Sequence, residues 1–371
     1  MSDPDASSAQ GLLRQWGLTR TGIGLRVLIA VGAIVVVAAG VVAYTTITRN
    51  QLDPNRQAAW AGRGATAVAA GPQGVLYAAF LREIYEINPG AGTVTLVAGR
   101  ATDPGPGQPA AAADGDAAPG AAIRPTALAI GPKGQVYFAD QLSGTVRAIQ
   151  GGNLKSLGRA EQLGGLAVNQ SNGTVYFSDQ TGEQVFGINP VSGGVAPVAG
   201  NGQSGFGGDG GPALAAEFAH PDGVAVVSGR LLIADSGNDR IREVDLRTGV
   251  ITTVAGSGKR GLAGNGGSAI HAQLDNPAAV AADPEGGFAF ADQGNHQLRR
   301  VSARGVISAL AGNGQPGTDN PESSVGAASA HLKQPAGLVY AGQDLYFVDN
   351  FQLRLLRAGQ VSYFTPPANP G

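Results

Sequence analysis

Short apolar runs separated by turn residues repeat along most of the chain. Between residues 220 and 256 four such runs follow one another, at 224–227, 231–234, 241–244 and 250–254. The segments between them are rich in Gly, Asp and Asn, which favour tight turns. This pattern predicts four strands of an antiparallel meander. A single meander cannot bury both of its apolar faces, so it needs neighbours of the same kind.

Copies of this unit are present. Pro221 and Asp235 recur as Pro277 and Asp292, 56 and 57 residues later. Six units can be aligned in this way, at 65–99, 124–158, 163–200, 220–256, 276–312 and 334–366. Six four-stranded sheets arranged radially form a closed propeller whose sheet edges are short and protected. The sequence therefore predicts an all-β, six-bladed β-propeller over residues 63–366.

The repeat resembles the NHL family of propeller repeats. The likeness lies in the Val-Ala-Gly end of the unit, the Pro-x-Gly-Val-Ala start, the Tyr-x-Ala-Asp second strand and the stretch from Asn295 through His296 to Leu298. It covers roughly residues 60–366 and implies the propeller fold. It does not by itself fix a function, because propellers host many. The exported sensor propellers of bacterial receptor kinases are similar, although residues 1–26 are too few to hold a kinase.

The composition adds few constraints. The net charge of −2 offers no electrostatic basis for binding nucleic acid. The chain contains no cysteine, so the fold needs no disulfide and tolerates an oxidising compartment.

Residues 27–47 form an apolar run without a charged side chain. This run is long enough for a helix that spans a bilayer. We therefore expect a disordered cytoplasmic tail at 1–26, a transmembrane helix at 27–47, a linker at 48–62 and a C-terminal tail at 367–371. The larger domain is expected outside the cytoplasm, giving a single-pass protein of the cell membrane. The alternative is a secreted protein released by signal cleavage near Ala43. Residues 58–62 resemble a strand end and are expected either to pair with the last blade near 361–364 or to form a membrane-proximal linker with an exposed Trp60.

The connections between units suggest where a partner binds. Four of the five are long, at 100–123, 201–219, 257–275 and 313–333, and only 159–162 is short. Long loops within a compact domain are commonly functional. In a meander, these crossings and the turns between the second and third strands are expected to lie on the same rim. That loop-rich face is predicted to bind a protein or a cell-envelope ligand through Phe206, Asp209, Arg240, Asn295, His296 and Phe351.

An aspartate ends the second strand of five units, and an arginine follows seven residues later in three of them. Recurrence in equivalent copies favours a structural role in capping the turn and pairing with the arginine. A ring of carboxylates that attracts a cation is the alternative. The residues are Asp140, Asp179, Asp235, Asp292 and Asp349.

Three histidines, His220, His271 and His331, lie near the ends of crossings. As ligands of a divalent metal ion they would suit a lactonase-like hydrolase or lyase. The sequence contains no Ser-His-Asp pattern of a nucleophilic enzyme, and each histidine fits a structural role in the repeat. The sequence therefore favours a membrane-tethered binding, sensor or scaffold module without a cofactor, and the metal-dependent enzyme remains the alternative.

Overall fold

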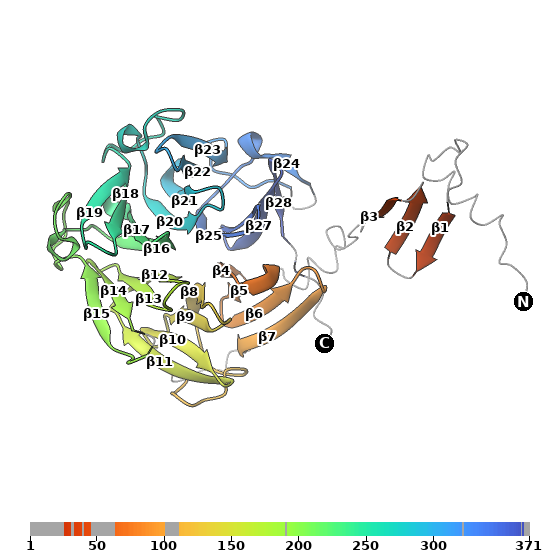
Figure 1. Cartoon of the computed structure of the whole chain (residues 1–371), viewed down its shortest axis with the longest axis horizontal. Coiled ribbons are helices and arrows are strands. Elements are labelled where there is room, and N and C mark those ends of the chain that lie inside the picture. Colours follow the sequence, from red (N-terminus) through yellow and green to blue (C-terminus); the bar gives the residue numbers. More distant parts are fainter. Residues whose placement is uncertain are drawn as a thin grey trace, which may run out of the picture. The chain divides into compact units, whose positions relative to one another are not determined.

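The computed structural model describes residues 26–30, 33–38, 41–45, 64–100, 111–189, 191–320, 323–364 and 366. The chain divides into two units, residues 1–51 and 52–371, and each is described by itself. In the second unit the strands form six separate antiparallel sheets arranged around a common centre (Figure 1). The predicted six-bladed propeller is confirmed.

Each blade is a meander of four consecutive strands, from the innermost to the outermost. Blade one contains β4 (Ala65–Ala70), β5 (Leu76–Phe80), β6 (Glu83–Asn88) and β7 (Thr93–Gly99). Blade two contains β8 (Pro125–Ile130), β9 (Val136–Asp140), β10 (Thr145–Gln150) and β11 (Asn153–Arg159). Blade three contains β12 (Leu163–Val168), β13 (Val175–Asp179), β14 (Gln184–Ile188) and β15 (Val195–Ala199).

Blade four contains β16 (Pro221–Val227), β17 (Arg230–Asp235), β18 (Arg240–Asp245) and β19 (Ile251–Ala255). Blade five contains β20 (Pro277–Ala282), β21 (Gly287–Asp292), β22 (Gln297–Ser302) and β23 (Ile307–Ala311). Blade six contains β25 (Pro335–Ala341), β26 (Asp344–Asp349), β27 (Gln352–Arg357) and β28 (Gln360–Tyr363), and β24 (Val325–Gly326) adds a fifth strand. Short 3-10 turns occur at η2 (Pro72–Gly74), η3 (Ala213–Ala215), η4 (Ser236–Asn238), η5 (Ala269–His271), η6 (Gln293–Asn295) and η7 (Ala327–Ser329).

The core lies between the blades. Apolar side chains of each sheet pack against the next sheet, as Phe138 and Leu128 of blade two do in one cluster with Ile84 of blade one. The ring closes where β25 lies beside β4, and the N–H of Ala65 donates to the carbonyl of Phe351 at 2.7 Å. The predicted pairing of residues 58–62 with the last blade lies outside the described residues. Val361 instead pairs with Val325 of β24.

The first unit differs from its prediction. Its described residues form a three-stranded antiparallel sheet of β1 (Arg26–Ala30), β2 (Ala33–Ala38) and β3 (Val41–Thr45), in the order β1-β2-β3. The sequence predicts a transmembrane helix over 27–47, and the structure does not show it. The segment is rich in Val and Ile, whose branched side chains also suit strands. Among the described residues, no helix is both long and apolar enough to cross a membrane.

Four of the crossings share one contact that joins consecutive blades. A single alanine donates its N–H at 2.8 Å to a glycine carbonyl in the turn before the outermost strand of the following blade. The carbonyl of the same alanine accepts, at 2.9 Å, the N–H of the glycine that ends the preceding blade. We call these residues the wedge alanines; they are Ala118, Ala213, Ala269 and Ala327. Each closes the gap between two outer strands.

The crossings also cover the outer edges of the blades. Gly210 donates its N–H to the carbonyl of Ile251 at 2.7 Å, and Ile251 donates to Gly211 at 3.1 Å. Gly266 and Gly267 make the same pair of bonds with Ile307 in blade five. A covered edge cannot pair with another chain, which explains why the loops are long. The sequence interpretation placed the crossings on one rim, but their middle parts run along the outer strands.

Candidate functional site

The candidate site lies on the rim where the crossings end. There the turn after the second strand of each blade meets the residues that precede the first strand. In blade four the N–H of Gly237 donates to the carbonyl of Ala219 at 2.8 Å, and in blade five Gly294 donates to Asp275 at 2.9 Å. We call this face the crossing rim. Its residues come from crossings and turns that repeat from blade to blade.

Buried ion pairs fix the crossing rim. The five recurrent aspartates are at most 6% exposed. Asp235 accepts the N–H of Ala219 at 2.9 Å and lies 3.4 Å from the guanidinium of Arg242. Desolvation raises the pKa of Asp235 to about 6, while the bonds from Ala219, Asn238 and Arg242 oppose that rise. Asp292 with Arg299 and Asp349 with Arg354 form the same pair, each at 3.0 Å.

The arginines of these pairs also hold the crossings. Arg242 is fully buried and donates to the carbonyls of Glu217 at 2.6 Å and Gly207 at 2.7 Å. Arg299 donates to the carbonyl of Gln273 at 2.8 Å, and Arg354 to that of His331 at 2.8 Å. The carboxylates therefore face buried partners within the chain. Four blades follow a long crossing, and each of them has a buried arginine at this position. These arginines are Arg147, Arg242, Arg299 and Arg354.

Three of the predicted binding residues come together in front of blade four. The ring of Phe206 lies 3.9 Å from the Arg240 guanidinium and is 43% exposed. Arg240 also donates to the carbonyl of Gly256 at 3.0 Å, which fixes its position between two crossings. Asp209 accepts from Arg242 at 2.8 Å and from the hydroxyl of Thr253 at 2.6 Å. Phe206 and Arg240 thus offer a rigid aromatic and cationic surface, and Asp209 is committed to contacts within the chain.

The other predicted binding residues lie elsewhere on the crossing rim. Asn295 donates to the carbonyl of Gly261 at 2.6 Å and to Asp292 at 2.9 Å. His296 has a positive φ of 54° and its ring contacts the carbonyl of Lys333 at 3.0 Å. Phe351, in the corresponding turn of blade six, is 55% exposed. Leu81 of blade one is 48% exposed, and both side chains adjoin Gly64 at the seam between blades six and one.

The three histidines proposed as alternative metal ligands are in different environments. The backbone N–H of His220 donates to Glu183 at 2.7 Å, and the ring of His331 lies 3.1 Å from Asp319. His271 ends the 3-10 turn η5 and is exposed. Each crossing ends near one buried apolar residue: Phe218, Leu274 or Leu332. His220 follows this residue in its crossing, whereas His271 and His331 precede it, so the three histidines are not equivalent. No group of three or more His, Asp or Glu side chains that could hold a metal ion occurs in the part of the chain that the structure describes.

The sequence analysis missed Asp222. It is the second residue of β16, an innermost strand, and Gly164 of blade three packs against its backbone. Ser178 donates to its carbonyl at 2.5 Å, and Gln180 forms a hydrogen bond with its carboxylate. Desolvation raises the pKa of Asp222 to about 7, against this bond. The equivalent residues of the other blades are uncharged, and aligning the six inner strands would have revealed the exception: Thr66, Thr126, Gly164, Ala278 and Ala336.

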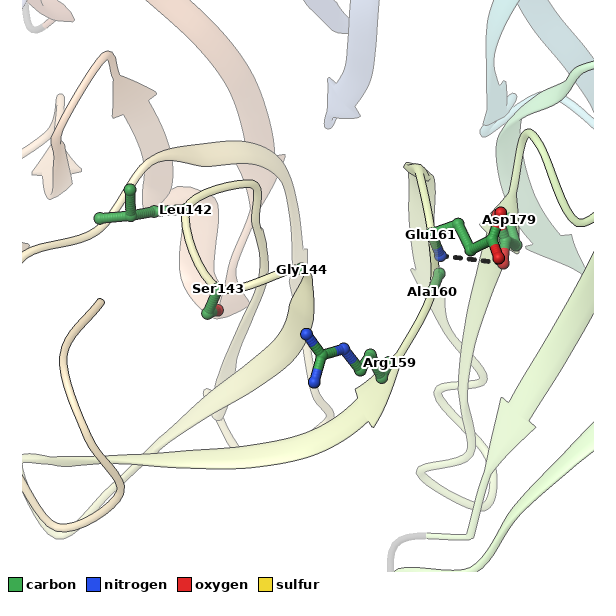
Figure 2. Close-up of a pocket in the computed structure, with 7 residues that line it drawn as sticks. All are labelled: Leu142, Ser143, Gly144, Arg159, Ala160, Glu161 and Asp179. Carbon is green, nitrogen blue, oxygen red and sulfur yellow. Dashed lines mark hydrogen bonds between the residues drawn. The ribbon is translucent and has the colours of Figure 1, made fainter. Parts of the chain in front are cut away.

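The short junction between blades two and three leaves a cleft of about 690 Å³. Its walls are the turn of blade two, the junction itself and Asp179 of blade three (Figure 2). Figure 2 shows Arg159 pointing from the junction toward the turn at Ser143 and Gly144. Asp179 accepts the N–H of Glu161 at 3.1 Å and of Gln162 at 3.2 Å. No wedge alanine fills this gap.

Comparison with known proteins supports the fold. No protein-family model matches the chain, so the resemblance to NHL repeats stays a prediction. The chloroplastic protein SUPPRESSOR OF QUENCHING 1 of Arabidopsis thaliana is 28% identical over 152 residues. The match covers 34% of this chain and only 14% of that protein.

Solved propellers align over most of the chain. An auxiliary nutrient binding protein from Bacteroides ovatus has a TM-score of 0.57 at 16% identity, covering 81% of this chain and 70% of its own. XC5397 from Xanthomonas campestris, described as a gluconolactonase, has a TM-score of 0.53 at 11% identity, covering 92% and 95%. At such low identity these likenesses show the propeller fold alone.

Proposed function

We propose that the chain is a recognition module that binds a protein or cell-envelope ligand on the crossing rim. The observation that carries this proposal is the stacking of exposed Phe206 on Arg240 at 3.9 Å. Aromatic and arginine side chains dominate the energetics of protein interfaces, and an anchor that is already rigid loses little entropy on binding. Leu262, 37% exposed, occupies the place of Phe206 in the next crossing and extends this apolar surface.

The seam between blades six and one supplies a second apolar anchor. Phe351 and Leu81 are both about half exposed on the turns that face the crossing rim. Large exposed side chains that recur on one face are more typical of a protein partner than of a small substrate, which is usually enclosed. We therefore favour a sensor or scaffold that binds a protein over a lactonase-like enzyme.

We further propose that this module acts outside the cytoplasm and is tethered to a membrane. The support is the uncharged run at 27–47, which has the length of a bilayer span, and the resemblance to exported sensor propellers. Secretion after cleavage is the competing arrangement.

Site-specific photo-crosslinking of the full chain in cells tests the binding face. A photoreactive residue at position 206 is expected to give a discrete adduct with a partner. The same residue at position 247, where the Arg247 side chain is 84% exposed in a turn away from this rim, serves as the matched control. Phe206→Ser should reduce an adduct formed from position 351. Equal adducts from positions 206 and 247 would contradict the assignment.

Cysteine labelling tests the location. Because the chain has no cysteine, Arg247→Cys creates a single reactive thiol. A membrane-impermeant maleimide should label it in intact cells, and alkaline extraction should leave the chain in the membrane fraction. Labelling only after lysis would place the propeller in the cytoplasm, and release by alkali would argue against the tether.

A further inference from the structure

The outer edge of blade three differs from those of blades two, four, five and six. Its preceding junction is short, so no crossing lies along β15. The two groups that a wedge alanine would join are still present, the N–H of Arg159 and the carbonyl of Gly193. The turn and strand start at 191–195 are exposed, with Val191 at 95% and Val195 at 43%. The place that a crossing fills in those four blades is open here.

The hydrogen-bonding groups of this edge can be inferred from blade four. Ile251 is equivalent to Val195, and its N–H and carbonyl both bond to the crossing. The carbonyl of Gly249, equivalent to Gly193, accepts from the wedge alanine Ala213. Within the described chain, no crossing residue bonds to Val195 or to the carbonyl of Gly193. Three backbone groups therefore point outward and are available for an added strand.

Two residues of blade three differ from their equivalents in blade four in a way that fits the absence of a crossing. Phe186 stands where Arg242 holds the crossing of blade four, and it stacks on Phe177 at 5.3 Å. Pro197 stands where the N–H of Thr253 donates to Asp209, so the donor that would have no partner is absent. Both changes suit a blade whose own chain supplies no cover.

Apart from Pro197, which already removes one N–H, this edge lacks the usual protection of an exposed strand. Lysine and other charged side chains commonly prevent pairing with a foreign strand. No charged residue occurs between Glu183 and Asp209. An uncharged edge with outward N–H and carbonyl groups is competent to accept a strand.

We propose that the β15 edge binds an extended peptide strand from another polypeptide. The crossings specify its chemistry: a glycine-rich stretch antiparallel to β15, followed by a small residue that enters the gap between Arg159 and Gly193 as a wedge. Addition of such a strand to a sheet edge is a common mode of peptide recognition. This surface is separate from the Phe206 anchor, so either assignment can fail without the other.

The test uses the full chain and a labelled peptide with the sequence of residues 204–219, SGFGGDGGPALAAEFA. Fluorescence anisotropy should show saturable binding that a scrambled peptide lacks. Val195→Pro removes one outward N–H and should weaken binding by about tenfold or more, whereas Val195→Thr keeps the N–H and should bind as the unaltered chain does. Pro197→Thr restores a donor for the peptide aspartate and should tighten binding.

Several outcomes would overturn the proposal. One is the absence of saturable binding, and another is equal affinity for the unaltered chain and both the proline and threonine variants. Pro197→Thr keeps the test decisive even if Val195→Pro fails to fold, because a gain in affinity cannot come from unfolding. Analytical ultracentrifugation of the chain without peptide tests whether a second copy of the chain occupies the edge. A dimer that Val195→Pro converts to monomer would assign the edge to a second copy and not to a foreign strand.

Discussion

The guanidinium of Arg242 lies 2.8 Å from the carboxylate of Asp209, which precedes it by 33 residues. A fully buried side chain of β18 thus holds a loop that belongs to the connection between two blades. The same arginine lies 3.4 Å from Asp235, so one cation joins the loop, the strand and the turn. This network fixes the crossing rim on which Phe206 and Arg240 lie.

Removing Arg242 is expected to be costly. Arg242→Met keeps much of the volume but leaves Asp235 buried without its cation, which typically costs about 3–5 kcal/mol. Urea denaturation should show the loss as a lower midpoint. The control is Arg230→Met, since Arg230 is 48% exposed in its pair with Glu243 and should contribute less than about 1 kcal/mol. Similar losses for the two variants would mean that the buried network does not stabilise the blade.

The glycine that ends the Val-Ala-Gly motif has a structural requirement. Gly256 has a φ of 91°, and a Cβ there would lie 2.4 Å from the carbonyl oxygen of Asp239. Gly256→Ala should therefore destabilise the chain by about 3 kcal/mol or more. Gly249→Ala is the matched control, because Gly249 also has a positive φ, of 72°, but open space around it. It should cost about 1 kcal/mol, from backbone strain alone.

Thermal denaturation of both variants checks this prediction. Equal shifts would show that the close approach to Asp239 does not decide the choice of glycine. The sequence agrees with the structural reason: Arg159 replaces this glycine at the one junction without a wedge alanine, and Arg159 does not have a positive φ.

The fold was predictable because its signals are local and repeated. Apolar runs such as 224–227 and turn residues recur in the same order in six units, and this repetition identifies blades without any long-range information. The candidate site was less accessible. Phe206 and Arg240 are 34 positions apart, and only the folded ring brings the aromatic face onto the guanidinium.

Other features required comparison between blades. The wedge alanines are unremarkable in sequence, since the role of Ala213 depends on carbonyl and N–H groups of two different blades. Asp222 is the one charged residue at its position in the six inner strands, and only an alignment of these strands makes it stand out. The helix expected over 27–47 illustrates a different limit, because an apolar run rich in Val and Ile is compatible with helix and with strand.

Asp222 should make stability depend on pH. Its pKa is raised from 3.8 to about 7 in the folded chain, so the folded state holds a proton that the unfolded state has lost between these values. This contribution is complete below about pH 4 and disappears as the pH rises through 7. Asp222→Asn should abolish this pH-dependent contribution. The stability of the variant relative to the unaltered chain should therefore be higher at pH 8 than at pH 5. Between pH 5 and pH 8 the gain is at most about 3 kcal/mol, and smaller because part of the residue is accessible.

The melting temperatures of the two proteins at pH 5 and pH 8 measure this difference. Asp245→Asn is the control, because N–H bonds from Arg247 and Thr248 lower the pKa of Asp245. Its contribution is lost only as the pH falls below this window, so Asp245→Asn should leave the difference between pH 5 and pH 8 unchanged. If Asp222→Asn leaves the pH dependence unchanged, Asp222 is better solvated than its position indicates.

Metal binding distinguishes the recognition module from the alternative enzyme. A catalytic zinc ion usually has three protein ligands. His220 and His331 belong to different crossings, and the described residues contain no group of three or more side chains that could hold a metal ion. We therefore expect zinc or calcium to shift the melting temperature of the full chain negligibly, and elemental analysis to find less than one equivalent. A stoichiometric ion that is lost in a His220→Ala, His271→Ala variant would instead favour the hydrolase or lyase, and it would require the crossings to rearrange around the metal.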